Sequence, residues 1–336
     1  MPVAHAALRR PVVLLTNPMA ASVAQALAPQ FELRQAPVTD AQTLCHAARD
    51  AHYIVVRAPL PAELFEQAPM LRGVVRHGAG LDMIPVAQAS AHGVAVANVP
   101  AVNARSVAEY AMAQMLALAR QLPECENALR AGDWSGPRAH AEHLPDLHAK
   151  TVAIVGTGAI GKALAQMCSA GFGMRVLGVR RSAARDSAKI TFTSLDGALA
   201  TADFLVLACP LNEATRHLIN THTLARAKPG LFIVNVARGA VIDTPALEAA
   251  LESGQVAGAA LDVFETQPLP AHARLRQLPR VRLTPHLAGI THGSMQRMSE
   301  GVAEQLQQML AGQMPRHLCN PEAVHAIRAR WAHLRP

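Results

Sequence analysis

The stretch that decides the fold is TVAIV at residues 151–155, followed by GTGAIG at 156–161 and an Ala-, Leu- and Met-rich run at 162–170. The apolar β-branched run predicts a buried strand, and the run behind the glycines predicts a helix. Glycines at G-x-G-x-x-G spacing between a strand and a helix form the fingerprint of a dinucleotide-binding turn. The sequence therefore predicts a bound dinucleotide.

Each of the three glycines has a physical role in such a turn. Gly156 lets the chain turn, Gly158 lets the backbone approach a pyrophosphate, and Gly161 lets the helix pack against the strand. The phosphates then lie on the unpaired N–H groups and the positive dipole end of the helix. We therefore expect Ala159 and Ile160 to face them as well.

The composition limits the classes of protein that fit. A chain of 336 residues with 51% hydrophobic residues can fill two cores, and with only 3% aromatic residues these cores must consist of Ala, Val, Leu and Met. The formal charge is +7 and the pI is about 9.6, but the basic residues are scattered, with no aromatic residues between them. This pattern favours anionic small molecules over nucleic acid as partners.

The cysteines and the apolar runs indicate the compartment. Five widely spaced cysteines without a C-x-x-C pair are typical of a reduced, cytoplasmic protein. The apolar run at 11–15 is too short for a signal peptide and predicts a first strand. The longer run at 107–119 contains Glu109 and Gln114, so we expect neither a transmembrane segment nor a membrane partner.

The first hundred residues alternate short strands with helices. Apolar β-rich runs predict strands at 12–15, 53–56 and 73–76. Helical patterns cover 20–27, 41–50 and 62–67. This alternation predicts an α/β domain of flavodoxin-like size, followed by a long helix that ends near residue 120.

The segment 123–150 is rich in Gly and Pro, which predicts loops. It contains His140, His143 and His148. Because these histidines have no Cys partner and no helix to fix their spacing, we expect them to be solvent-exposed rather than to bind a metal ion.

The alternation resumes after the glycine turn. Strands are predicted at 175–179, 203–209, 231–237, 256–263 and 281–284, and helices at 195–201, 221–227 and 244–253. Together with 151–155 these strands make six, enough for a doubly wound parallel sheet whose carboxyl ends carry the chemistry. A helix at 295–310 and a short C-terminal helix follow, and we expect this tail to pack on the first domain.

The residues after the second strand of this sheet indicate which dinucleotide binds. An NAD-binding fold carries Asp or Glu there to bind the ribose hydroxyls, whereas this chain has Arg180, Arg181 and Ser182. Two guanidinium groups and a hydroxyl can hold a 2′-phosphate by charge-assisted hydrogen bonds. We therefore predict NADP as the preferred cofactor, with NAD possible.

Three later strands end in residues suited to hydride-transfer chemistry. Arg238 follows one strand, Asp262 ends the next, and His286 follows the last. Beside a bound nicotinamide, an arginine can hold a carboxylate and polarise a carbonyl, and a histidine can exchange the proton while hydride moves. The order of these residues behind the fingerprint predicts an active site.

These residues identify a family. The motifs HGAGLD at 77–82, SVAE at 106–109, NVARG at 235–239, ALDVFE at 260–265 and TPHLAG at 284–289 resemble those of the D-isomer-specific 2-hydroxyacid dehydrogenases. The resemblance implies two doubly wound parallel-sheet domains with a cleft between them, and a homodimer. It implies a substrate domain at 1–101 and 295–336, and an NAD(P)-binding Rossmann domain at 102–294.

The same resemblance assigns residues to roles. It implies that Arg238 binds substrate and that His286 is the acid/base. It places the substrate at Leu60, His77, Gly78, Ala79, Gly80 and Asn103. It places the cofactor at Cys209, Pro210, Thr215, Val236, Ala237, Asp262 and Gly289 as well as at the glycine turn.

The chain departs from the family at Gln267, where the dehydrogenases mostly carry a glutamate that pairs with the histidine. An amide can orient the ring but cannot stabilise the imidazolium by charge, so we predict a lower pKa for His286 than with a carboxylate partner. Alternatively, Glu265 supplies the carboxylate. Formate dehydrogenases share Gln-Pro at this place, but they carry an acidic residue in the cofactor loop that this chain lacks.

The sequence predicts a 2-keto acid reductase of the glyoxylate or hydroxypyruvate class. Leu60 and Met83 are expected to leave room only for small substrates. Formate oxidation is one alternative. A cofactor-sensing regulator is the other, since corepressors resemble this family too, but the presence of both Arg238 and His286 argues against it.

Overall fold

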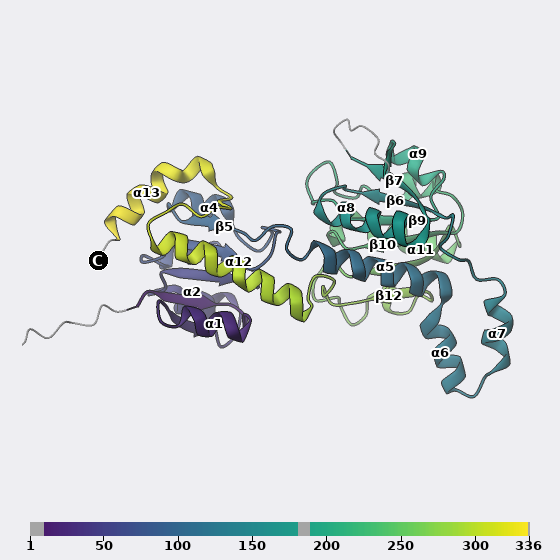
Figure 1. Ribbon diagram of the computed structural model, residues 1–336, viewed down its shortest axis with the longest axis horizontal. Helices are drawn as coiled ribbons and strands as arrows, with labels where there is room; N and C mark the ends of the chain where they lie inside the picture. Colours follow the sequence, from purple (N-terminus) through teal and green to yellow (C-terminus); the bar gives the residue numbers. More distant parts are fainter. Residues whose placement is uncertain (1–9, 181–188, 335–336) are drawn as a thin grey trace, which may run out of the picture. The chain divides into compact units, whose positions relative to one another are not determined.

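The computed structural model describes residues 10–180 and 189–334 (Figure 1). It divides the chain into two compact units. The first unit comprises Met1–Asn103 and Thr291–Pro336, and the second comprises Ala104–Ile290. The borders expected from the sequence, 101/102 and 294/295, lie near these.

The first unit contains a five-stranded parallel sheet in the order β2-β1-β3-β4-β5. Its strands are β1 (Val12–Leu15), β2 (Glu32–Gln35), β3 (Tyr53–Val56), β4 (Gly73–Arg76) and β5 (Ala95–Ala97). This order is that of a flavodoxin-like doubly wound sheet, which confirms the predicted fold class for this unit.

Helices cover both faces of this sheet, because alternate side chains of each strand point to opposite faces. One face packs against α2 (Ala41–Ala48), α3 (Leu64–Gln67) and α4 (Val86–Ala91). The other packs against α1 (Ala21–Leu27), α12 (His292–Leu310) and α13 (Val324–His333).

The C-terminal tail packs on the first unit, as predicted. After the 3₁₀ turn η4 (Pro321–Ala323), α13 brings two side chains onto the loop before β4. Arg330 donates to the carbonyl of Leu71 at 2.6 Å, and Trp331 Nε1 donates to the carbonyl of Arg72 at 2.9 Å. The Leu71 carbonyl thereby gains a donor, and the Arg72 carbonyl also accepts the N–H of Ala95 in β5 at 3.1 Å.

The sequence pattern misses two strands of this sheet. β2 reads Glu-Leu-Arg-Gln and lies at an edge, where its side chains are exposed or half-buried. β5 has only three residues. An exposed edge strand does not need an apolar run, and three residues are too few to reveal a period of two.

The second unit contains a seven-stranded parallel sheet in the order β12-β11-β10-β9-β6-β7-β8. Its strands are β6 (Thr151–Val155), β7 (Arg175–Val179), β8 (Thr191–Phe192), β9 (Phe204–Leu207), β10 (Leu231–Asn235), β11 (Val256–Leu261) and β12 (Val281–Leu283). The six predicted strands are present. The seventh, β8, is a two-residue edge strand that no sequence period could reveal.

Both faces of this sheet are covered, which explains the uninterrupted apolar run of β6. One face packs against α5 (Ala104–Arg120) and α8 (Ala159–Gln166), which continues as the π-helix η1 (Met167–Gly171). The other packs against α9 (Leu195–Leu199), α10 (Thr221–Ala225) and α11 (Thr244–Glu252). Short 3₁₀ turns lie at η2 (Gly239–Val241) and η3 (Arg274–Arg276).

The prediction of loops over 123–150 is confirmed for 142–150 and wrong for most of 123–141. The segment contains α6 (Leu122–Arg130) and α7 (Ser135–Ala141), which form a pair beyond the end of α5 (Figure 1). Pro123 lies in the first turn of α6, where proline needs no hydrogen-bond acceptor, and Glu126 pairs with Arg130 one turn on. Proline here begins a helix instead of preventing one.

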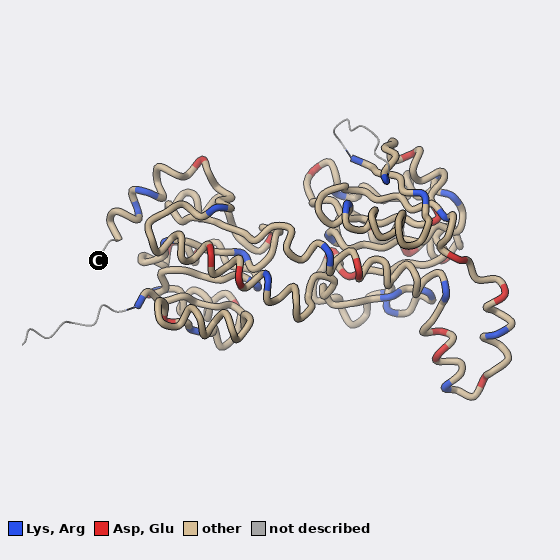
Figure 2. The backbone as a smooth tube through the Cα atoms, in the orientation of Figure 1, with Lys and Arg blue, Asp and Glu red and all other residues tan. Residues whose placement is uncertain are grey.

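The lengths of the helices and the distribution of charged residues bear on the partners expected from the composition. None of the helices formed by residues 10–180 and 189–334 is long and apolar enough to cross a membrane. Basic and acidic residues are interspersed in both units (Figure 2).

Candidate active site

The predicted catalytic and cofactor residues of the second unit follow the carboxyl ends of its parallel strands. β6 leads into the glycine turn, β7 into Arg180, β10 into Arg238 and β11 into Asp262. His286 follows β12. Because all seven strands run in one direction, these positions share one edge of the sheet, where doubly wound folds bind their ligands.

The glycine turn fits a dinucleotide. Gly156 has a φ of +94°, and a Cβ there would lie 2.6 Å from the backbone nitrogen of Cys209. A Cβ on Gly161 would collide with the carbonyl oxygen of Gly156, whereas one on Gly158 would project into open space. Two glycines therefore allow close packing, and the third leaves the space that a pyrophosphate needs.

Helix α8 supplies donors at this turn. Gly158 precedes its first residue, and Lys162 donates to the carbonyl of Gly158 at 2.9 Å. The first N–H groups of an α-helix have no acceptor within the helix. Those of Ala159 and Ile160 are therefore suited to bind phosphate oxygens at the positive end of the helix dipole.

Arg180 lies at the end of β7 and is exposed. Its guanidinium carbon is 5.9 Å from the centre of the Phe192 ring, which places a cation beside an aromatic face. Arg181 and Ser182 lie outside the described residues.

The loop after β9 holds three more predicted cofactor residues. Cys209 is buried and Pro210 is exposed. Thr215 Oγ1 donates to the carbonyl of Pro210 at 2.8 Å and accepts the N–H of Asn212 at 2.8 Å. The two hydrogen bonds of the Thr215 hydroxyl thus hold this loop together. Burial raises the pKa of the Cys209 thiol above its ordinary value.

Asn235 shapes the turn that presents Arg238. Its side chain donates to the carbonyl of Arg238 at 3.0 Å and accepts the N–H of Ala237 at 3.0 Å. Arg238 Nη1 donates to the carbonyl of Ala237 at 2.7 Å. Ala237 and the preceding Val236 are buried, so Arg238 is the polar side chain that this turn presents.

In the structure, the side chain of Gln267 is hydrogen-bonded to the ring of His286. Gln267 Nε2 donates to the carbonyl of Phe264 at 3.2 Å, which leaves its Oε1 toward His286 Nδ1 at 3.3 Å. Because Oε1 can only accept, the proton of this hydrogen bond is on Nδ1 of His286.

Glu265, the alternative partner, lies elsewhere. Its Oε1 is 2.7 Å from His217 Nε2, and its Oε2 accepts the Thr244 hydroxyl at 2.7 Å. Burial alone raises the pKa of Glu265, but the hydrogen bonds from Thr244 and His217 outweigh this effect and lower the pKa overall. Glu265 thus ties the β11–β12 connection to α11.

Asp262 holds the turn that carries His286. It is 1% exposed, and its Oδ1 accepts the N–H of Leu287 and its Oδ2 the N–H of Ala288, each at 2.8 Å. His286 itself donates its N–H to the carbonyl of Asp262 at 2.8 Å and has a φ of +54°. Such a left-handed conformation costs a non-glycine residue about 1–3 kcal/mol, and these bonds maintain it. The half-buried Gly289 completes the turn.

In the first unit, the glycine-rich loop after β4 is held through its carbonyls. Arg76 donates to the carbonyls of His77 at 2.8 Å and Gly80 at 3.1 Å. Val99 N–H donates to the carbonyl of Gly78 at 2.9 Å, and the Asn98 side chain donates to the carbonyl of Ala79 at 2.8 Å. A loop held in this way can offer the amides of Ala79 and Gly80 to an anion.

The other predicted substrate residues differ in exposure. Leu60 is buried in the core of the first unit, and its N–H donates to the carbonyl of Met83 at 2.9 Å. Asn103 is half-buried directly before α5. Gly78 is buried with a φ of +142°, a value that favours glycine.

His77 is buried and neutral. Ser299 Oγ accepts the N–H of Ala20 at 3.0 Å and is hydrogen-bonded to His77 Nε2 at 2.9 Å. Burial, together with Arg57 and Arg76, lowers the pKa of His77 to about 4. Its Nδ1 has no hydrogen-bond partner among the described residues.

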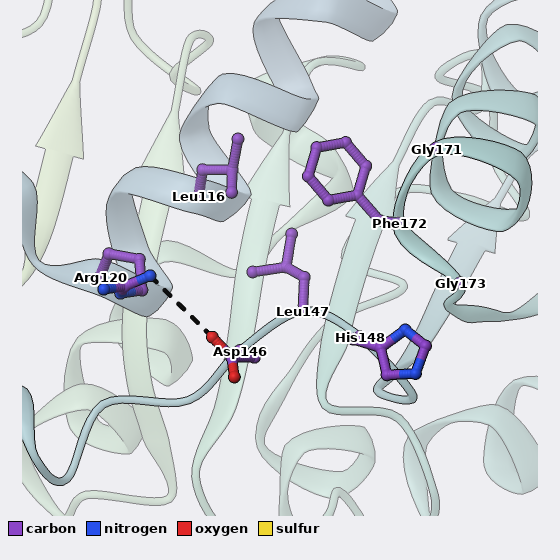
Figure 3. Close-up of a pocket in the computed structure, with 8 residues that line it drawn as sticks. All are labelled: Leu116, Arg120, Asp146, Leu147, His148, Gly171, Phe172 and Gly173. Atoms are coloured by element: carbon purple, nitrogen blue, oxygen red, sulfur yellow. Dashed lines mark ion pairs between the residues drawn. The ribbon is translucent and has the colours of Figure 1, made fainter.

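A cavity of about 500 Å³ in the second unit lies away from these residues (Figure 3). Leu147 and His148 line it just before β6, and Phe172 lines it just before β7, so it lies at the amino ends of the strands.

Across the part of the chain that the structure describes, no group of three His, Cys, Asp or Glu residues could hold a metal ion. The carboxyl edge remains the candidate site.

Comparisons with known proteins agree with this geometry. The model of the family described as D-isomer specific 2-hydroxyacid dehydrogenase, NAD binding domain, matches residues 112–288. Glyoxylate reductase from Thermococcus kodakarensis is 36% identical over 94% of this chain and 98% of its own.

Solved structures are similar over most of the chain. An NADPH-dependent glyoxylate/hydroxypyruvate reductase from Sinorhizobium meliloti has a TM-score of 0.81 at 31% identity, covering 92% of this chain and 97% of that one. An NAD-dependent formate dehydrogenase from Staphylococcus aureus has a TM-score of 0.80 at 27% identity, covering 90% and 96%.

The buried His77 predicts an acid-sensitive first unit. Its pKa of about 4 lies below the ordinary 6.5, so between these values only the unfolded chain binds the proton, and stability falls as the pH falls. We expect this histidine to remove about 2 kcal/mol of unfolding free energy between pH 7 and pH 5. Urea unfolding of His77→Phe should show a shallower pH dependence.

His46→Gln, a change of an exposed histidine in α2, is the matched control and should leave the pH dependence unaltered. An unchanged slope in His77→Phe would contradict the assignment of His77 as the acid-sensitive group.

Proposed function

This chain belongs to the D-isomer specific 2-hydroxyacid dehydrogenase family, and we propose that it reduces a small 2-keto acid of the glyoxylate or hydroxypyruvate type to the D-2-hydroxy acid, and catalyses the reverse. The observation that carries this proposal is His286, oriented by Gln267 at the sheet edge that also presents Arg238 and the glycine turn.

The residues divide the reaction between them. When bound, the reduced nicotinamide cofactor supplies the hydride that adds to the keto carbon. His286 Nε2 gives a proton to the carbonyl oxygen, so that one hydride and one proton convert C=O to CH–OH. Arg238 binds the carboxylate and polarises the carbonyl. In the reverse direction, neutral His286 accepts the hydroxyl proton.

The first unit contributes anion recognition. The loop that Arg76 holds through its carbonyls leaves the amides of Ala79 and Gly80 suited to bind an anion such as a carboxylate. Asn103 contributes a side-chain amide. Leu60 is buried in the core of this unit, so we assign the limit on substrate size to the half-buried Met83, against whose apolar side chain a phosphate group would be desolvated.

We infer NADPH as the preferred reductant. Exposed Arg180 at the end of β7 is suited to pair with a 2′-phosphate, because a guanidinium binds phosphate oxygens by charge-assisted hydrogen bonds. The chain has no carboxylate at 180–182 that would repel this phosphate.

We also propose that α6 and α7 form a homodimer contact. All residues of both helices are exposed or half-buried, and Leu122, Leu129 and Trp134 are 55%, 51% and 66% exposed. Large apolar side chains gathered on one protruding helix pair are typical of an interface. A second copy of this chain offers the same apolar face, so a two-fold contact would cover these side chains with their own counterparts.

The reaction is tested with glyoxylate, hydroxypyruvate, pyruvate, phenylpyruvate and formate, each with the NADP and NAD cofactors. We expect turnover of small 2-keto acids and a higher kcat/KM with NADPH. His286→Ala should lower kcat by about 10²–10⁴-fold, the usual contribution of a general acid. His272→Ala, at an exposed histidine of the same unit, is the control.

Arg180→Ala should lower kcat/KM with NADPH and leave kcat/KM with NADH unchanged. Arg175→Ala, at the other end of β7, should change neither value. A preference for NADH would refute the cofactor proposal. Turnover of formate alone would favour a formate dehydrogenase, and cofactor binding without any turnover would favour a regulator.

Gln267→Glu tests the partner of His286. A carboxylate beside the ring stabilises the imidazolium, so the pKa of His286 should rise, by about one pH unit for a partly exposed pair. Because reduction needs protonated His286, the alkaline limb of the rate profile should move to higher pH. Gln277→Glu adds the same charge at an exposed position and should not move it. An unmoved limb in Gln267→Glu would show that the pairing is not functional.

Sedimentation velocity tests the dimer. We expect a species of about twice the 35.6 kDa chain mass, and Trp134→Glu should shift it toward the monomer because it places a charge in the apolar contact. Glu142→Gln, just beyond α7, is the control. A monomeric wild-type chain would rule out the contact.

A further inference from the structure

A chain of hydrogen bonds leads from helix α5 to the turn that carries His286. The Tyr110 hydroxyl is hydrogen-bonded to Thr284 Oγ1, and Thr284 Oγ1 donates to Asp262 Oδ1 at 2.6 Å. The Asp262 carboxylate also accepts the N–H groups of the two residues after His286. These hydrogen bonds therefore connect a side chain of helix α5 to the backbone that positions the acid/base His286.

The direction of each hydrogen bond follows from the number of protons. Thr284 has one hydroxyl proton, which it gives to Asp262, since a carboxylate only accepts. Tyr110 must therefore be the donor to Thr284. Burial raises the pKa of Tyr110 above its ordinary value, so its hydroxyl keeps this proton at neutral pH.

The position of His286 needs this support. Its φ of +54° lies in the left-handed region that a histidine adopts only when neighbouring bonds impose it. Thr284 is the residue at which the chain leaves β12 for this turn, and its carbonyl also accepts the His286 N–H at 3.0 Å. A shift of Thr284 therefore moves His286 directly.

We propose that Tyr110 is a positioning residue for His286, acting through Thr284 and Asp262. Its hydroxyl holds Thr284 against the carboxylate and so restrains the turn from which His286 acts. The inference rests on the proposed function, in which His286 supplies the proton. It goes beyond that function, because Tyr110 lies on helix α5 and not in the turns after the strands, which carry the groups assigned to the reaction.

The chain provides a matched control, since it has only two tyrosines. Tyr53 is fully buried in the first unit, and its hydroxyl has no hydrogen-bond partner among the described residues. Tyr110→Phe and Tyr53→Phe thus remove the same atom, once from the chain of hydrogen bonds and once from a site without one.

Three measurements on the full chain test the proposal. Tyr110→Phe should lower kcat about threefold to tenfold, the range for loss of one hydrogen bond, while the Kd for the nicotinamide cofactor stays unchanged. Amide hydrogen exchange in a peptide spanning 284–289 should become faster, with the rest of the second unit unaffected. Tyr53→Phe should show none of these changes.

Substitutions of Thr284 test the route of the effect. Thr284→Ser keeps the hydroxyl and should retain most of the activity, whereas Thr284→Val should lose it as Tyr110→Phe does or more. The double variant Tyr110→Phe/Thr284→Val should be no worse than Thr284→Val alone, because both changes break one chain. Fully additive losses would overturn the proposed route.

The remaining outcomes also decide the proposal. If Tyr110→Phe matches Tyr53→Phe in both kcat and exchange at 284–289, Tyr110 does not position His286. Faster exchange throughout the second unit would indicate a general loss of stability and overturn it too. If the wild type turns over no 2-keto acid, the proposed function fails, while exchange at 284–289 still decides whether Tyr110 restrains the turn.

Discussion

The carboxylate of Asp262 holds the turn on which the proposed chemistry depends. It is 1% exposed, and burying a charge is costly unless donors satisfy it. Its two oxygens accept three hydrogen bonds, all from the segment that follows β12. Because β11 and β12 are parallel neighbours, a side chain at the end of one reaches the turn after the other. The hydrogen bonds that compensate for burying the carboxylate therefore also fix the position of His286.

Close approach of backbone segments explains which glycines the site contains. Gly156 lies against the backbone of the loop after β9, and Gly239 lies against the backbone of Phe264, so neither position has room for a Cβ. Both contacts join neighbouring strand ends. The edge of the sheet that brings the reacting side chains together therefore needs glycine where neighbouring backbone segments touch.

The two units hold their loops by different means. In the second unit, buried side chains such as Asp262 accept hydrogen bonds from backbone N–H groups. In the first, the guanidinium of Arg76 donates to backbone carbonyls. A turn held through its N–H groups suits the presentation of a side chain, whereas a loop held through its carbonyls keeps its amides for an anion.

The sequence by itself determined the elements with a strong local signal. Strand β6 and its glycine turn follow from a continuous apolar run and a fixed spacing, and the positions of Arg238 and His286 after strands follow from chain order. Helices α6 and α7 do not follow from the composition of their segment, because Gly and Pro are typical of loops, yet proline also begins helices.

Only the tertiary structure decided between Gln267 and Glu265. They lie two residues apart, so no spacing separates them, and the choice depends on His217 and Thr244, which draw Glu265 away. The role inferred for Tyr110 was likewise hidden, because its partner Thr284 lies 174 residues further along the chain. Local periodicity reports which residues form a strand or a helix, whereas hydrogen bonds between distant segments exist only once the sheet has brought the strand ends together.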